Sequence, residues 1–292
     1  MYYKNRGYKV FSVFNTVFLI GLSLLCIMPL IHILAVSFSG RGPATANIIG
    51  LWPIDFTIES YEKTLSSGNF LRSITNSVLR TVIGTIVGMS LIVAAGYALS
   101  KENPFFKTKA VYTWFFVFTM LFNGGLVPTY VLISKIHLMN SFWVLILPGA
   151  VSVYNMILMM NFFKAVPREL EEAAYLDGAG VFITLWKVYL PVSLPAIATL
   201  SLFTLVWHWN SWFDGLIYLT DVEKYPMATY LQTIVVQQDF SKISLDPQSL
   251  ENMSQRTVKA AQIFITALPV LVIYPFLQKY FVKGIVLGAV KE

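Results

Sequence analysis

Six long, apolar and almost uncharged stretches limit what this chain can fold into. A bilayer core about 30 Å thick is spanned by about 20 helical residues. Backbone polar groups in lipid must be satisfied within the protein, and these stretches are too long for the strands of a membrane barrel. We therefore expect helical spans over about residues 11–38, 78–100, 110–134, 142–164, 190–219 and 258–280.

The composition agrees with a membrane protein. The chain is 56% hydrophobic and only 12% charged, whereas a soluble domain carries about 25% charged residues. The net charge is +6, and the charged residues lie between the apolar stretches without forming a basic stripe. We therefore expect membrane lipid, and no nucleic acid, as a partner. The first apolar stretch is longer than the roughly 7–15 residues of a signal-peptide core, so we expect it to remain as a span.

Lys and Arg residues favour a topology with both chain ends in the cytoplasm, because cytoplasmic loops carry an excess of them. The short loop after the second stretch holds Lys101, Lys107 and Lys109. The sequence therefore predicts one transmembrane domain over residues 1–292. Long outer loops are expected at about 40–76 and 221–257. Such a loop could cap a pore, receive a partner or be a solvated connection.

Several spans contain helix-breaking residues. Such residues either line a transport path or mark simple kinks. Trp207, Asn210 and Asp214 have the spacing of one helical stripe, which would face the bundle interior or water. The nearby tryptophans fit either an interfacial belt or a stacking surface for sugar rings. The candidate substrate-path residues are Asn123, Tyr130, Asn155, Trp207, Trp209, Asn210, Trp212 and Asp214.

The loop at about residues 165–190 has the pattern of two short amphipathic helices around a turn. Pro167 suits a first helical position, and the acidic residues that follow suit the first turns. Asp177-Gly178 is a turn signal. On these grounds alone, the loop is either a linker on the membrane surface or a helix pair that docks into a partner's groove.

The same loop resembles the EAA loop of binding-protein-dependent ABC importer permeases. The resemblance rests on Glu172-Ala173-Ala174, Gly178 and Leu190-Pro191, with Val188 at a position that is often Ile in the family. The segments 122–130 and 145–150 resemble the carbohydrate-uptake branch. Within it, the chain is similar to the MalG-type second permease, in the LplC or YtcP subgroup.

This resemblance implies a type I importer permease, an all-α membrane protein of about six helices in the bacterial plasma membrane. It also implies four partner chains: a second, MalF-like permease, two cytoplasmic ATPase subunits that bind ATP and Mg²⁺, and an extracytoplasmic sugar-binding protein. The cargo would be oligosaccharides or polysaccharide fragments, acidic ones such as alginate or pectin fragments included. The residues that would couple to the ATPase are Glu171, Glu172, Ala173, Ala174, Asp177 and Gly178.

No catalytic, cofactor or metal site is expected in the chain itself. It contains no Gly-Lys dipeptide and hence no phosphate-binding loop of the Walker A type, and its histidines, His32, His137 and His208, are far apart in sequence. A secondary transporter or channel would share the six spans but leave the EAA-like loop unexplained. An ABC permease for peptides, amino acids or metal chelates is the other alternative, and an intramembrane enzyme lacks a catalytic constellation.

Overall fold

A computed structural model describes residues 6–101, 107–239 and 256–289, and these residues are helical with connecting turns and loops. The chain divides into two compact units. One unit consists of residues 1–70 and 233–268, and the other of residues 71–232 and 269–292. Each is described by itself.

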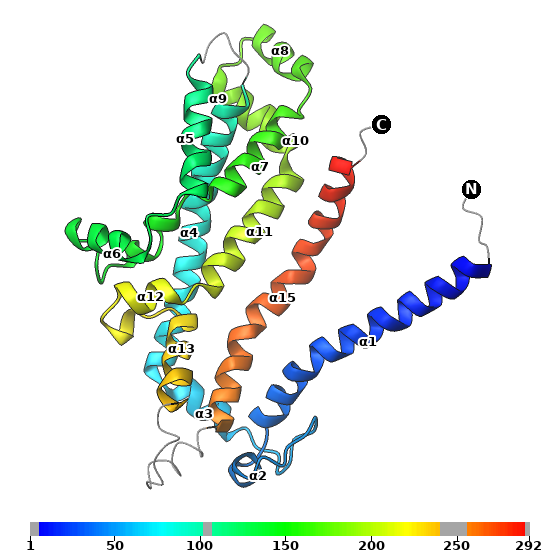
Figure 1. Ribbon diagram of the computed structural model, residues 1–292, viewed down its shortest axis with the longest axis vertical. Helices are drawn as coiled ribbons and strands as arrows, with labels where there is room; N and C mark the ends of the chain where they lie inside the picture. The colour runs from blue at the N-terminus through cyan, green and yellow to red at the C-terminus, as the bar shows by residue number, and fades with distance from the viewer. Residues whose placement is uncertain (1–5, 102–106, 240–255, 290–292) are drawn as a thin grey trace. The chain divides into compact units, whose positions relative to one another are not determined.

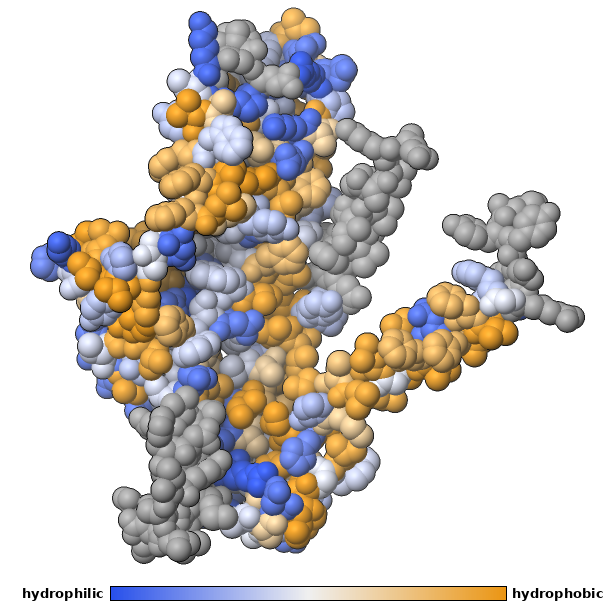
Figure 2. Space-filling view, viewed as in Figure 1, coloured by the Kyte–Doolittle hydropathy of each residue, from blue (hydrophilic) through white to orange (hydrophobic). Residues whose placement is uncertain are grey.

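The first unit begins with a long apolar helix, α1 (Arg6–Ser37). Its side chains from residue 7 to residue 28 are exposed, and Figure 2 shows the helix as almost continuously hydrophobic. A helix that is apolar on all sides is suited to contact with lipid or with another membrane protein. Short helices α2 (Arg41–Thr45) and α3 (Glu59–Ser66) follow α1.

The second unit is a helix bundle whose longest element is α4 (Gly68–Ser100). Figure 1 shows α4 running beside α5 (Lys109–Leu121), α7 (Val153–Lys164) and α11 (Leu194–Asn210). Its core is apolar and includes Ile92, Met159, Phe163 and Leu200, each no more than 1% exposed. Its other elements are α6 (Leu126–Lys135), α8 (Arg168–Leu176), α9 (Val181–Thr184), α10 (Leu190–Val192), α12 (Phe213–Tyr218), the short 3-10 helices η1 (Phe142–Leu145), η2 (Leu147–Gly149) and η4 (Val222–Lys224), and the π-helix η3 (Leu185–Tyr189). Two further helices, α13 (Met227–Asp239) and α15 (Arg256–Ala289), each belong partly to both units.

Glycines allow the helices around α4 to approach closely. A Cβ atom at Gly84 would lie 2.5 Å from the His208 ring, and one at Gly88 would lie 2.9 Å from the carbonyl oxygen of Ala150. The GxxxG pattern in this stretch is typical of helices packed against others in a membrane, and α4 is packed in this way.

Three straight helices among the described residues are long and apolar enough to span a membrane. The number rises to six if three bent helix pairs each count as one span. The pair α5 and α6 bends by 114°, the pair η1–η2 and α7 by 51°, and the pair α9–α10 and α11 by 84°. The chain is thus an all-helical protein with up to six spans, several of them broken.

Three expected spans differ from the structure in detail. The stretch 142–164 is not one straight helix, because it bends by 51° between η2 and α7. The stretch 110–134 is not one straight helix, because Asn123 to Gly125 interrupt it and Gly125 adopts a φ of 87°. The stretch 190–219 is broken at Ser211, whose ψ of 121° ends α11. Trp207, Asn210 and Asp214 therefore do not share one continuous helical stripe. Part of the outer loop expected at 221–257, residues 240–255, lies outside the described residues.

Candidate functional site

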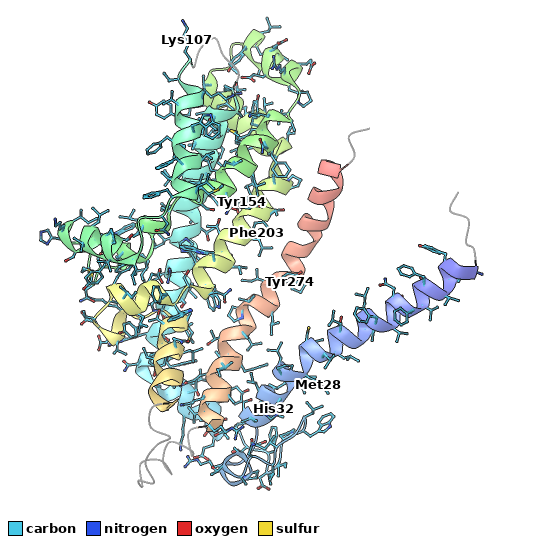
Figure 3. All side chains as sticks on the ribbon, viewed as in Figure 1. Met28, His32, Lys107, Tyr154, Phe203 and Tyr274 are labelled. Carbon is cyan, nitrogen blue, oxygen red and sulfur yellow. The ribbon has the colours of Figure 1, made fainter. Side chains whose placement is uncertain are left out.

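A cavity of about 930 Å³ lies where α11 ends and α12 begins, with η1, η2 and α15 completing its wall. Its size is within the range of ligand pockets in proteins, roughly 300–1,000 Å³. The wall is mostly apolar and includes aromatic side chains, two of which Figure 3 labels, Phe203 on α11 and Tyr274 on α15. Aromatic faces with a few polar groups suit a ligand that has apolar faces and polar edges, as a sugar ring does.

The break in the helix at the cavity exposes backbone carbonyl groups that side chains from other elements satisfy. Arg80 of α4 donates a hydrogen bond of 3.0 Å to the Ser211 carbonyl oxygen. The Thr229 hydroxyl donates one of 2.8 Å to the Trp212 carbonyl oxygen. Irregular backbone at membrane depth is tolerated where protein groups satisfy it in this way, so the bend has a defined geometry.

Arg80 also forms an ion pair with Asp214 at the cavity wall. Both guanidinium NH₂ groups of Arg80 donate to the Asp214 carboxylate, and the backbone N–H of Gly215 donates to it as well. The Arg80 side chain is fully buried, whereas the Asp214 side chain is 23% exposed. A charged arginine in a membrane helix requires such a partner. The pair makes this part of the wall polar without a net charge.

The predicted substrate-path residues separate into two groups. Trp207, Asn210, Trp212 and Asp214 all line the cavity. The other four, Asn123, Tyr130, Asn155 and Trp209, do not.

Local contacts account for three of the residues that lie away from the cavity. The Asn123 side chain accepts a hydrogen bond from the Gly125 backbone N–H in a turn. The buried Asn155 amide donates to the Thr204 hydroxyl. Tyr130 stacks on Tyr218 with ring centroids 6.3 Å apart.

Several members of the cavity wall were missed in the sequence. Phe203, Phe213, Tyr218 and Tyr274 line the cavity beside the predicted tryptophans. Aromatic residues are frequent throughout the apolar stretches, so residue type alone does not separate these four from those facing lipid. Arg80 carried a usable signal, since an ionisable residue at the edge of an apolar stretch indicates a polar partner.

The loop that follows α7 forms a second candidate site, at the end of the second unit where α5 begins (Figure 1). Pro167 is the N-cap of α8, so the helix begins at Arg168, one position after the first helical residue expected from the sequence. Gly178, with a φ of 80°, makes the turn to α9. This conformation favours glycine because it has no Cβ.

Most predicted coupling residues lie on the surface of this loop. Glu172, Ala173, Asp177 and Gly178 are exposed, Ala174 is half-buried, and Glu171 faces inward with its side chain 16% exposed. Large apolar side chains are exposed beside them: Leu176 by 89%, Phe182 by 78% and Trp186 by 69%. Figure 2 shows much hydrophilic surface at this end of the unit. Apolar side chains within a polar surface are typical of a contact site for another protein.

No group of three His, Cys, Asp or Glu side chains within the described part of the chain is arranged to hold a metal ion. The structure thus offers two candidate sites. One is a cavity with aromatic side chains and an ion-paired carboxylate. The other is a loop whose exposed surface combines apolar and polar side chains.

Comparison with protein families identifies the chain. The family model described as "binding-protein-dependent transport system inner membrane component" matches residues 64–287. The chain belongs to this family. The matched range includes the cavity wall, the loop, α4 and nearly all of α15, so this family member is a multi-pass membrane protein with the type I permease fold.

Known relatives match this permease along its entire length. It is 38% identical over 293 residues to the Bacillus subtilis polygalacturonan/rhamnogalacturonan transport system permease protein YtcP, covering 99% of both chains. It is 36% identical over 289 residues to Protein LplC of the same organism, covering 99% of this chain and 97% of the relative.

A solved structure agrees with the fold of this permease. A chain from the crystal structure of a bacterial ABC transporter involved in the import of the acidic polysaccharide alginate matches it with a TM-score of 0.87 at 30% identity. The match covers 96% of this permease and 100% of that chain.

Proposed function

We propose that this chain is a membrane-spanning subunit of an ATP-driven importer for sugars and that it forms one half of the translocation pore. A second, MalF-like permease would provide the other half, and an extracytoplasmic sugar-binding protein would deliver the cargo in a bacterial plasma membrane. The observation that carries the proposal is the agreement over nearly the whole chain with permeases of polysaccharide transport systems. Delivery of the cargo by a binding protein is supported by the family of this chain, which is described as binding-protein-dependent.

The cargo we propose is an oligosaccharide from an acidic polysaccharide. One relative is named for polygalacturonan and rhamnogalacturonan transport, and the similar crystal structure for alginate import. The cavity supports this chemistry because its wall combines aromatic rings with Asn210 and Ser211, whose side chains can hydrogen-bond the hydroxyl groups of a sugar. Asp214 is the one carboxylate among the lining residues, and Arg80 neutralises it, so the wall does not repel a uronate.

The loop after α7 would couple this permease to the ATPase. Glu172, Ala173 and Gly178 are exposed on it, and small side chains allow a partner to approach the helix closely. The exposed Leu176 and Phe182 would fill apolar depressions on the ATPase, and Glu172 would accept a charge-assisted hydrogen bond there. In this arrangement ATP and Mg²⁺ are bound by the partner and not by this chain.

A pull-down tests the proposal. The tagged chain is extracted from native membranes in a mild detergent, and the proteins that accompany it are identified and counted by mass spectrometry. We expect a second permease and two ATPase copies for each copy of this chain. Recovery of the chain alone, or only with itself, in several detergents would contradict the proposal and favour a secondary transporter.

The cargo class is tested separately with purified binding protein from the same gene neighbourhood. Titration with trigalacturonate and with its fully methyl-esterified form compares an acidic and a neutral ligand of the same length. Tighter binding of the acid supports the proposed cargo. Binding of neither, together with binding of a peptide or amino acid, would contradict it while leaving the pore function intact.

A further inference from the structure

Helix α8 presents two neighbouring glutamates in different directions. The Glu171 side chain is 16% exposed, whereas Glu172 is exposed to solvent together with Ala173. With 3.6 residues per helical turn, one residue rotates a side chain by about 100° around the helix. Glu171 therefore points toward the bundle and Glu172 away from it, although they are identical and adjacent in the sequence.

Three hydrogen bonds hold the Glu171 carboxylate. The Lys101 ammonium donates to Oε1 at 2.7 Å, the Tyr175 hydroxyl to Oε1 at 3.0 Å and the Tyr189 hydroxyl to Oε2 at 2.6 Å. Lys101 directly follows α4, and Tyr189 ends η3. This one carboxylate consequently joins α8 to two elements outside the helix.

Lys101 is itself fixed in place. Its ammonium lies 4.0 Å from the centroid of the Tyr97 ring and 3.8 Å from that of the Tyr189 ring, distances at which a cation is attracted to an aromatic face. The two rings contact each other and Phe163 edge to face. Lys109 donates a hydrogen bond to the Lys101 carbonyl oxygen. The cation is thus held between aromatic rings of the core, and its side chain is 24% exposed.

The electrostatics of the pair favour a permanent contact. Burial alone raises the pKa of Glu171, but the hydrogen bonds from Lys101 and Tyr189 and the charge of Lys101 bring it below its ordinary value. Burial lowers the pKa of Lys101, and Glu171 offsets part of this change. The Glu171 carboxylate is therefore charged at neutral pH. Removing one member of a partly buried pair leaves the other without compensation.

The helix that ends at Lys101 also reaches the cavity. Helix α4 is 33 residues long and contains no proline. Arg80 lies on it about 30 Å before Lys101, at a rise of 1.5 Å per residue, and pairs with Asp214 at the cavity wall. One uninterrupted helix therefore connects the residue that binds α8 with the residue that binds the cavity wall (Figure 1).

We propose that Glu171 is a positioning residue that locks α8 to α4 and η3, so that movement imposed on α8 reaches the cavity wall through α4. Glu172, on the outward side, would make the contact with the ATPase. This inference rests on the function proposed above. It divides the six predicted coupling residues by role, since Glu171 would transmit the movement without touching the ATPase.

The test uses the purified importer with its ATPases, in lipid nanodiscs. The reporter is a cysteine in place of Phe203 on the cavity wall, in a chain whose own cysteine is removed by Cys26→Ser. Its labelling rate with N-ethylmaleimide is measured without nucleotide and after trapping with ATP and vanadate. This readout needs no knowledge of the cargo. We expect trapping to change the rate several-fold in the otherwise unaltered chain.

Glu171→Gln and Glu172→Gln form a matched pair of variants. With Glu171→Gln we expect the normal number of bound ATPases and the loss of most of the change in labelling rate. With Glu172→Gln we expect ATPases to dissociate about ten-fold more readily. Tyr189→Phe removes one hydrogen bond while keeping the ring, so it should lower the response less than Glu171→Gln and serves if the latter folds poorly. The exchange Lys101→Glu with Glu171→Lys should restore part of the response.

Two outcomes would overturn the inference. One is a Glu171→Gln variant that loses its ATPases as Glu172→Gln does. The other is a correctly folded Glu171→Gln variant with an unchanged labelling response. Failure of the proposed function would look different: no ATPase would accompany the unaltered chain, or trapping would leave its reporter unchanged.

Discussion

Arg80 and Asp214 illustrate how a membrane protein keeps two charges within its helices. Arg80 is fully buried, and its two terminal NH₂ groups donate to the Asp214 carboxylate and the Ser211 carbonyl oxygen, whereas its Nε has no hydrogen-bond partner among the described residues. Taking both charges out of water costs several kcal/mol for each ion, and only their mutual attraction and hydrogen bonds offset it. The pair therefore adds specificity to the bend between α11 and α12 more than it adds stability.

The first prediction concerns this pair. Arg80→Met should lower the free energy of unfolding by about 3 kcal/mol, because it leaves Asp214 without its counter-charge. Arg80→Met combined with Asp214→Leu should recover most of this loss. Thermal unfolding of the purified chain in detergent, followed by size-exclusion chromatography, measures both. If the double variant lost as much free energy of unfolding as Arg80→Met and Asp214→Leu lose together when each is made alone, the two residues would not be coupled in the way the structure indicates.

Which charged residues pair with each other was the feature of the two sites hardest to predict from the sequence. The sequence places Arg80 and Asp214 at the edges of two apolar stretches, but they are 134 positions apart and nothing in the pattern joins them. The pair Lys101 and Glu171 is 70 positions apart. The EAA-like motif groups Glu171 with Glu172, while only the packing of α8 against the bundle turns one inward and the other outward.

The helical elements followed more directly from the sequence. Long apolar stretches have few alternatives in lipid, so the all-helical class is confirmed. Asn123-Gly124-Gly125 indicated one break, and Pro148 and Pro191 lie close to two others. Pro29, Pro269 and Pro275 were expected to break spans as well, but they lie inside the continuous helices α1 and α15. The size of each bend, such as 114° between α5 and α6, depends on which neighbours satisfy the freed backbone groups. The break at Ser211 has neither glycine nor proline beside it, which explains why a continuous helix was expected there.

The second prediction concerns the close approach at Gly88. A methyl group there would lie 2.9 Å from the Ala150 carbonyl oxygen, a backbone atom that cannot rotate away. Gly88→Ala should therefore lower the free energy of unfolding by about 1–3 kcal/mol through overpacking. Gly21→Ala in α1 is the control, because a Cβ at Gly21 meets nothing within 4 Å. Alanine is about 1 kcal/mol better than glycine in a helix, so the control should be neutral or stabilising by thermal unfolding.

The third prediction is the pH dependence of the docking of α8. The pKa of Glu171 lies below its ordinary value of 4.5. A carboxyl group whose pKa is lower in the folded state stabilises that state above the unfolded pKa, and the contribution disappears as the pH falls through the folded pKa. Hydrogen exchange of the α8 amides, corrected for intrinsic rates, should show constant protection from neutral pH to about 4.5 and a decline below it.

Glu171→Gln serves as the control for this pH dependence. The variant has no carboxyl group to titrate at this position, so protection of α8 should be lower already at neutral pH and should change little on acidification. An equally steep acid response in both proteins would show that another group controls the docking of α8.

At the scale of the whole molecule, the sequence identified the membrane class and the permease family, and both are confirmed. The orientation in the membrane remains a prediction from the distribution of Lys and Arg. It bears on both sites, because the loop with α8 must face the cytoplasm if it is to meet an ATPase. Lys107 lies at the same end of the unit as α8 (Figure 3) and marks that side.

The fourth prediction tests the orientation with single cysteines in a Cys26→Ser chain. A cysteine replacing Lys107 should be protected from a membrane-impermeant maleimide in intact cells and should react once the cells are permeabilised. A cysteine replacing His137, which follows α6 in the short loop predicted to lie outside, should react in both conditions. Because the span expected at about residues 110–134 separates the two positions, their labels should be opposite. Reaction of the Lys107 cysteine in intact cells would place α8 outside and remove the basis for its coupling to a cytoplasmic ATPase.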